Sequence, residues 1–445
     1  MTKKYFKHIE VFTPSQPANY TFVERESVND RLTRAIRTPG KQIIIYGHSG
    51  VGKTSILIKK LKEQKIKYIT TRCITGMTLK DIVTDAFNQL EMYYLPLKEI
   101  TKGGKTGGAL SASYFGLKAT LSTELNDSNK QVVKRAVDLP ITPQTLAKFI
   151  GKASYCWVLE DYHKIKTEDK ILLSQIMKVF MDSSLDYPKL KIIALGAVNS
   201  AREVLQYDPE MKSRISEIEV PLMTDDKLLE ILEKGEALLN IKFPDYIKNK
   251  TINYSNGLPA ITHQLALLIC EKNNIFQTIR RSRTKEIIVN TFEAALDEYL
   301  EENSDTYKSI FEKATKIVHK RKSENPINIL NAILLSNQEE ITIHSVKANL
   351  RLENKNYKGN NLKKYLDELT TPARAEILRF NKNSNSYYFN NPFIKAYCQC
   401  ALRKDNKKDV NSSRLLQEFK GVLRKELEIA REAYFKDLAQ DGDIW

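Results

Sequence analysis

The residues with the clearest chemical meaning form a glycine-rich octapeptide. It runs from Gly47 to Thr54, reads Gly-His-Ser-Gly-Val-Gly-Lys-Thr, and matches G-x-x-x-x-G-K-[ST] at every fixed position. Glycines let the backbone amides of such a loop turn toward a phosphate, and the following helix adds positive potential at its first turn. Lys53 would reach the β- and γ-phosphates, and the Thr54 hydroxyl would hold Mg²⁺. The predicted ATP site therefore comprises Gly47, His48, Ser49, Gly50, Val51, Gly52, Lys53, Thr54 and Ser55.

A second group of residues could hold the metal and activate water. Residues 155–161 read Tyr-Cys-Trp-Val-Leu-Glu-Asp, an apolar run that closes on two carboxylates. We assign Glu160 to Mg²⁺, usually through water, and Asp161 to orienting the attacking water. The alternative is that the two acids only cap a strand. Most proteins with such a strand carry Asp at the first position, so Glu160 favours nucleotide binding over fast hydrolysis.

Two further polar residues accompany later apolar runs. Asn199 follows the run Lys191–Val198, where it could sense a γ-phosphate or cap the next helix. Arg214 precedes the run Glu217–Leu222, where it could act on the nucleotide of a neighbouring subunit or be an ordinary surface arginine. The pattern leaves both pairs of alternatives open.

Alternating strands and helices must bring these residues together. Gln42–Tyr46 reads as a strand before the loop, and Ser55–Glu63 as a helix after it. Further strands are predicted over Lys67–Cys73, the acidic run, Lys191–Val198 and Glu217–Leu222, with helices between them. This order predicts an α/β fold, the three-layer parallel sheet of the P-loop NTPases. Residues 92–150 form a long insertion with a basic glycine-rich loop over 102–108 and a hairpin-like stretch over Ser111–Glu124.

Length and composition limit the class of protein. With 445 residues the chain can form two or three domains, and 42% hydrophobic and 28% charged residues are typical of a soluble globular protein. No apolar run approaches the roughly 20 residues of a membrane-spanning helix. The five cysteines are scattered and the first residues lack an apolar signal region, which together predict a cytoplasmic protein. A net charge of +16 favours nucleic acid only modestly, because lysine is abundant throughout the chain.

Four stretches together resemble the AAA+ superfamily, most closely its STAND branch and the related origin-recognition-type ATPases. They are Thr21–Glu26 followed by Leu32, the octapeptide, Leu159–His163, and Tyr254–Pro259 with its Gly-Leu-Pro turn. The resemblance covers roughly residues 10 to 270.

The resemblance implies several further site residues. Phe22, Val23 and Arg25 would cover the adenine, and Pro259 would pack against the base or sugar. His263 would contact a phosphate, or serve only as a structural residue of the helix. Ala260 stands where many AAA+ proteins carry a second sensor arginine, which favours a switch over a motor.

The C-terminal part predicts a winged helix-turn-helix. Three short amphipathic helices over Pro326–Leu335, Ile343–Leu350 and Asn361–Leu369 are followed by a hairpin over Ala375–Phe380 and Ser386–Asn390. Lys363 and Lys364 could enter a DNA groove with Lys382 on the wing; alternatively the module packs on the nucleotide, as in STAND proteins. The predicted domains are a P-loop domain over 1–223, a helical lid over 224–275, a connector and winged helix over 276–402, and an amphipathic helix over 403–445.

Two functions remain open. The first is a slowly hydrolysing, ATP-dependent switch that self-associates or signals to an effector protein; its resemblance to STAND proteins implies bacterial anti-phage defence. The second is a DNA-loading ATPase that forms ATP-dependent oligomers on duplex DNA, with Arg214 serving the next subunit. Both imply ATP and Mg²⁺ as cofactors, and neither involves a membrane.

Overall fold

The computed structural model of the chain describes residues 5–90, 92–96, 112–117, 134–135, 142–196, 214–280, 284–317, 324–336, 338–381 and 384–406. The chain divides into two compact units, Met1–Phe292 and Glu293–Trp445. The first unit holds the glycine-rich loop and both predicted acids. Within the described residues, no helix combines the length and the apolarity that crossing a membrane would require.

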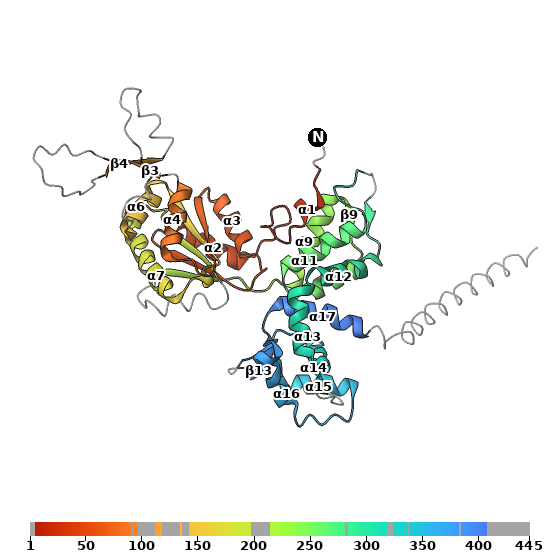
Figure 1. Cartoon of the computed structure of the whole chain (residues 1–445). Coiled ribbons are helices and arrows are strands. Elements are labelled where there is room, and N and C mark those ends of the chain that lie inside the picture. The colour runs from red at the N-terminus through yellow and green to blue at the C-terminus, as the bar shows by residue number, and fades with distance from the viewer. Residues whose placement is uncertain are drawn as a thin grey trace, which may run out of the picture. The chain divides into compact units, whose positions relative to one another are not determined.

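A five-stranded parallel sheet forms the centre of the first unit (Figure 1). Its strands, in the spatial order β2-β6-β7-β1-β8, are β1 (Gln42–Tyr46), β2 (Lys67–Arg72), β6 (Tyr155–Glu160), β7 (Ile192–Gly196) and β8 (Ile215–Glu219). All four strand pairs are parallel, so all five strands end at one edge of the sheet. The sequence prediction of a parallel sheet is confirmed. The loop after β1 and the acids that end β6 therefore share this carboxyl edge.

The last strand ends earlier than predicted. The sequence suggested a strand to Leu222, whereas β8 ends at Glu219. Val220 still donates from its backbone nitrogen to the Tyr46 oxygen at 2.8 Å. Pro221 has no N–H to continue the ladder, so the chain leaves the sheet there.

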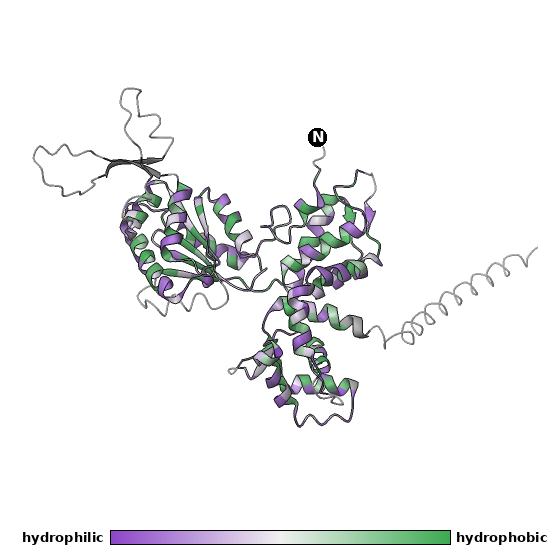
Figure 2. Ribbon diagram, viewed as in Figure 1, coloured by the Kyte–Doolittle hydropathy of each residue, from purple (hydrophilic) through white to green (hydrophobic). Residues whose placement is uncertain are grey.

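Helices cover both faces of the sheet. α2 (Glu26–Arg37) and α3 (Lys53–Glu63) pack together and against the strands on one face. The other face carries α4 (Leu79–Leu90), α6 (Pro143–Lys152) and α7 (Thr167–Asp182). In Figure 2 these helices show hydrophobic and hydrophilic stretches alternating along the ribbon, as expected when one side packs on the sheet. The arrangement has three layers.

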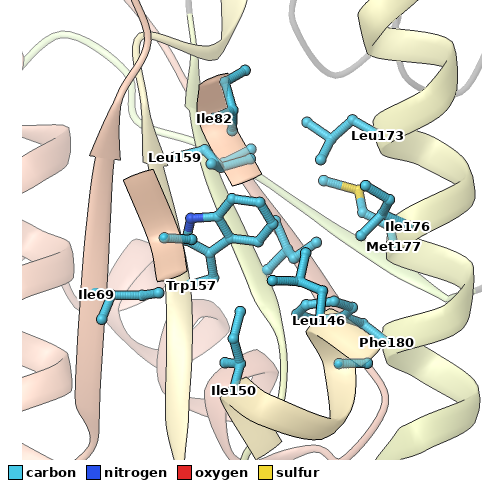
Figure 3. Packing of buried hydrophobic residues seen from close by; sticks show 14 of the residues in the cluster. Ile69, Ile82, Leu146, Ile150, Trp157, Leu159, Leu173, Ile176, Met177 and Phe180 are labelled. Atoms are coloured by element: carbon cyan, nitrogen blue, oxygen red, sulfur yellow. The ribbon is translucent and has the colours of Figure 1, made fainter. Parts of the chain in front are cut away.

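The main core surrounds Trp157 on β6 (Figure 3). Ile82 of α4, Leu146 of α6 and Phe180 of α7 lie around the indole ring, and all are fully or almost fully buried. The indole nitrogen donates to the Thr71 hydroxyl at 3.1 Å, so this buried polar atom is satisfied. α6 lies within the segment predicted as an insertion, yet its apolar residues belong to this core.

The rest of the predicted insertion contributes a small antiparallel sheet. β3 (Met92–Pro96) lies between β4 (Ala112–Leu117) and β5 (Lys134–Arg135). The predicted hairpin over Ser111–Glu124 contains β4, which pairs with β3; residues 118–124 and the basic loop over 102–108 lie outside the described residues.

The rest of the first unit is mainly helical and is called the lid from here on; it comprises the elements after β8 and a helix from the N-terminal end. Its elements are α1 (His8–Val11), α9 (Asp225–Leu239), α10 (Asp245–Ser255), α11 (Pro259–Lys272) and the parallel pair β9 (Ile241–Lys242) and β10 (Lys285–Glu286). α1 comes from the N-terminal end of the chain and packs on α9 and α11. α12 (Thr291–Glu302) begins where this unit ends.

The second unit contains the three predicted helices and the predicted hairpin: α14 (Pro326–Leu334), α15 (Ile343–Glu353), α16 (Leu362–Leu369), β12 (Leu378–Asn381) and β13 (Ser386–Phe389). It also contains α13 (Ser309–Thr315), α17 (Pro392–Asn406) and β11 (Ile341–Thr342). The strands form an antiparallel sheet in the order β11-β13-β12.

Short 3₁₀ segments cover Tyr162–Lys164, Ser183–Leu185 and Pro372–Arg374, and a π-helical turn covers Ser304–Lys308. The predicted helix over Arg414–Leu438 lies outside the described residues.

Candidate nucleotide-binding site

The glycines of the octapeptide are required by its backbone. Gly47 has φ 146°, and a Cβ atom there would overlap the carbonyl oxygen of Val220. Gly50 and Gly52 have φ 73° and 92°, in the region that other residues rarely adopt. Gly52 is also the N-cap of α3, so the loop leads directly into a helix N-terminus. The fixed glycines of the motif thus have a conformational reason.

Lys53 folds back across the loop that precedes it. Its Nζ donates to the carbonyl oxygens of Gly47 at 2.8 Å and His48 at 2.7 Å. An ammonium group has three donors, so one N–H remains for a phosphate oxygen. Burial lowers the pKa of Lys53 to about 8, and the charge of Asp161 opposes that shift. The lysine is therefore held at the loop and electrostatically linked to the predicted catalytic acid.

Both predicted acids lie at the carboxyl edge and form ion pairs. Glu160 ends β6 opposite Arg72 of β2, and Arg72 Nε lies 3.3 Å from the Glu160 carboxylate. Asp161 pairs with Lys164 at 2.6 Å and has φ 55°, which is unusual for a residue other than glycine. Only β7 separates β6 from β1, so strand spacing places the acids about 10 Å from the loop strand.

The first turn of the lid helix α11 reaches the loop directly. The backbone nitrogen of Ala260 donates to the Gly50 oxygen at 3.3 Å. Just before it, the Gly257 oxygen accepts from Met223 at 2.8 Å, and Gly257 has φ 73°. Pro259 is buried at the first position of α11, where its missing N–H costs nothing. The Gly-Leu-Pro turn thus brings a helix N-terminus to the outside of the phosphate loop.

The segment before α2 packs against the loop. Phe22 and Val23 are buried, and Lys59 of α3 has its Nζ 5.9 Å from the centre of the Phe22 ring. The guanidinium of Arg25 donates to the Pro221 oxygen at 2.9 Å and to the Val51 oxygen. Burial lowers the pKa of Arg25 to about 10. Of the predicted adenine-covering residues, Arg25 therefore contacts the loop, and Phe22 lies near α3.

Strand order, loop and lid together decide the fold. The chain has the α/β P-loop NTPase fold of the AAA+ type. Counted along the chain, the five strands of its sheet lie in the order 2-3-4-1-5, with the phosphate loop after the first and the acids at the end of the third.

Comparison with known proteins supplies structures of similar architecture. The chain is similar to the Walker-type ATPase PABY2304 of Pyrococcus abyssi, with 13% identity over 88% of this chain and 99% of that chain, and a TM-score of 0.49. It is also similar to the Aeropyrum pernix ORC2 protein (12% identity, 91% and 99%, TM-score 0.47) and to Cdc6p of Pyrobaculum aerophilum (14% identity, 89% and 98%, TM-score 0.43). No protein-family model matches the chain, and no curated protein sequence matches it. At these values, the roles of single residues in the P-loop site rest on the contacts described above.

Two assigned residues contact protein groups near the P-loop. Ser55 accepts at its hydroxyl from the backbone nitrogen of Ala18 at 3.1 Å, which fastens the N-terminal segment to α3. His263 is buried in the lid, where Nδ1 accepts from the Thr13 backbone nitrogen at 3.1 Å. Burial lowers the pKa of His263 to about 4, so the ring is neutral at pH 7. This position favours the structural alternative for His263.

The structure describes only one of the two polar residues predicted near the later strands, Asn199 and Arg214. Asn199 lies outside the described residues, so its role stays a prediction. Arg214 directly precedes β8 and its side chain lies 3.7 Å from the exposed carboxylate of Asp182. Its backbone oxygen accepts from Gln42 at the start of β1, which places Arg214 at the sheet edge opposite the P-loop. A role toward a neighbouring subunit's nucleotide stays a prediction as well.

Sequence reasoning missed two contacts of the site. Arg72 carries no motif, and only the adjacency of β2 and β6 places it at Glu160. The Ala260–Gly50 contact is made by backbone atoms, which no side-chain pattern reports. The sequence carries one indication at this position, because Ala260 replaces the sensor arginine that many AAA+ proteins carry there.

Proposed function

We propose that this chain binds ATP with Mg²⁺ at Gly47–Thr54, hydrolyses it slowly, and uses the nucleotide to set the contact between P-loop and lid. The observation that carries this proposal is the hydrogen bond from Ala260 of α11 to Gly50 of the loop. Because the lid is hydrogen-bonded to the backbone that would bind phosphate, phosphate binding would change this contact. The chain is then a switch in which one loop binds both the nucleotide and the lid helix.

The residues present suit this nucleotide. Within the described chain, the amides of Val51 and Gly52 donate to no protein group, and the third N–H of Lys53 is available. The Thr54 hydroxyl and the Glu160 carboxylate are oxygen donors of the kind that Mg²⁺ prefers. Bound Mg²⁺ would neutralise negative charge on the phosphates. Phe22, Val23 and Pro259 are the apolar residues that we assign to the base or ribose, and all three are buried.

The ion pairs of the acids support slow turnover. Asp161 shares one carboxylate oxygen with Lys164, and Glu160 shares one with Arg72, so each ion pair competes with the water or metal that the acid would hold. Both pairs are at least partly exposed, so each contributes modestly and can open. This supports slow ATP hydrolysis, because both acids are partly occupied by ion pairs.

Nucleotide binding and turnover test the proposal. Titration with MgATP should show binding to the wild-type chain, at least tenfold weaker binding to Lys53→Ala, and near-normal binding with lost hydrolysis for Asp161→Asn. A Lys53→Ala protein that binds ATP as the wild type does would overturn the proposal, because both the site and the switch depend on the loop.

A second candidate function is duplex DNA binding by the second unit. We infer that α14, α15, α16 and the β12–β13 hairpin are a winged helix, because the order of helices and strands is that of this module. Lys363 and Lys364 are neighbouring exposed residues of α16, as a groove-contacting helix would require; Lys382 on the wing lies outside the described residues. These lysines are the observation that favours DNA.

Salt-titrated duplex binding separates the two candidates. The DNA-loading function requires ATP-dependent binding whose affinity falls steeply with salt and weakens in the Lys363→Ala, Lys364→Ala double variant. The matched control is Lys347→Ala on α15. Light scattering of the same samples would show whether ATP also drives self-association, as a role for Arg214 in a neighbouring subunit requires. A role in defence against phages rests on the family resemblance alone, and no described residue adds to it.

A further inference from the structure

The phosphate loop has two faces, and the outer face is occupied by this chain's own donors. The Gly50 oxygen accepts from the Ala260 backbone nitrogen of the lid, and the Val51 oxygen accepts from the guanidinium of Arg25. Two consecutive peptide groups of the loop are thereby fixed from outside.

Fixing these oxygens also fixes the amides across the same peptide bonds. A trans peptide is planar, so its C=O and N–H point in opposite directions. The Gly50 oxygen is coupled in this way to the Val51 N–H, and the Val51 oxygen to the Gly52 N–H. Holding both oxygens on the outside therefore directs both amides to the inside, where a phosphate would bind.

Arg25 also joins the loop to the segment that leads into the lid. Its second N–H group donates to the Pro221 oxygen, directly after Val220, whose own oxygen lies against Gly47. Two residues later Met223 bonds to Gly257 at the start of the lid turn. One side chain thus spans the turn at Val51 and the linker between β8 and α9.

We propose that Arg25 is a positioning residue, which orients the P-loop amides for phosphate from the outer side of the loop and couples them to the lid linker. This inference rests on the proposed function, since it concerns the same P-loop. It differs from the sequence-based role of Arg25 as a residue that covers the adenine, because the guanidinium donates to backbone oxygens of the loop and the linker.

Binding of MgATP and of inorganic tripolyphosphate, which has no base or sugar, tests the proposal. Arg25→Met should weaken both by the same factor, about ten- to hundredfold, since two hydrogen bonds from a charged group are lost. The matched control is Arg31→Met, because Arg31 lies on α2, the helix that Arg25 directly precedes, and donates to the backbone oxygen of Glu217 in β8, away from the P-loop. That variant should bind both ligands as the wild type does.

Hydrogen exchange of the nucleotide-free protein supplies a readout that a direct ligand contact would not move. Exchange in the peptide that contains residues 47–56 should quicken in Arg25→Met and stay unchanged in Arg31→Met. Arg25→Lys, which keeps the charge but cannot bridge two oxygens in the same way, should give intermediate and again equal losses for both ligands. If Arg25→Met fails to fold, Arg25→Lys alone tests the positioning role of Arg25.

Three results would overturn the proposal. They are a loss for ATP without a loss for tripolyphosphate, equal losses in Arg25→Met and Arg31→Met, and unchanged loop exchange in a variant that binds weakly. Failure of the proposed function would look different, because the wild-type chain would then bind neither ligand.

Discussion

At the scale of single residues, Lys53 is the side chain on which the proposed phosphate binding depends most. It is held by the Gly47 and His48 oxygens and lies in the field of Asp161. Burial has lowered its pKa to about 8, so the nucleotide-free protein loses this charge at only mildly alkaline pH. Phosphate oxygens would favour the charged form, and the proton is then bound more tightly in the complex than in the free protein.

ATP affinity should therefore fall as the pH rises through 8. Below pH 8 both the free protein and the complex carry the Lys53 proton, and the affinity is flat. Above it, the free protein releases the proton that the complex keeps, so the dissociation constant should rise by up to about tenfold per pH unit. Isothermal titration between pH 7.5 and 9.5 measures this rise. Lys53→Arg stays charged throughout, so its profile should be flat; a flat wild-type profile would contradict the role of Lys53.

At the scale of elements, the linker between β8 and α9 is the part that joins sheet and lid. It passes Gly47 at Val220, receives Arg25 at Pro221, and meets the lid turn through Met223. Gly257 permits that meeting, because a Cβ atom there would lie 2.7 Å from Leu222 Cβ and 3.1 Å from the Met223 oxygen. The Gly-Leu-Pro turn is thus defined by close approach as well as by backbone conformation.

Substitution of two glycines should separate these effects. Gly257 and Gly76 have φ 73° and 91°, so alanine is strained at both, but no atom lies within 4 Å of a Cβ at Gly76. Gly257→Ala should lower the free energy of unfolding by about 1–3 kcal/mol more than Gly76→Ala, which is the typical cost of overpacking. Urea denaturation of both variants measures the difference. Equal losses would show that the linker does not press on the turn.

Sequence patterns predicted the elements better than their contacts. The strand before the octapeptide, the helix after it and the acidic run follow from local residue order, and the structure has them where expected. The pairing of Arg72 with Glu160 joins residues 88 positions apart and needs the order of strands in the sheet. The burial of His263 depends on which face of α11 meets α1 and α9, and a short motif does not specify that face.

At the scale of the whole molecule, the two proposed functions belong to different units. The first contains every described residue of the nucleotide site, including the lid contact, within Met1–Phe292. The second carries the three helices and the hairpin of the proposed winged helix. A nucleotide signal would begin at the lid turn, since α11 and the linker contact the P-loop and continue into the lid.

The measurement that tests this account most directly is hydrogen exchange at the lid turn with and without MgATP. We expect ATP to change the exchange of peptides that cover residues 220–224 and 257–264 in the wild-type chain, and to leave them unchanged in Lys53→Ala. Peptides from α6, which lies in the main core on the opposite face of the sheet from α3, serve as the internal control. Tight ATP binding to the wild type with no change at either lid peptide would contradict the account.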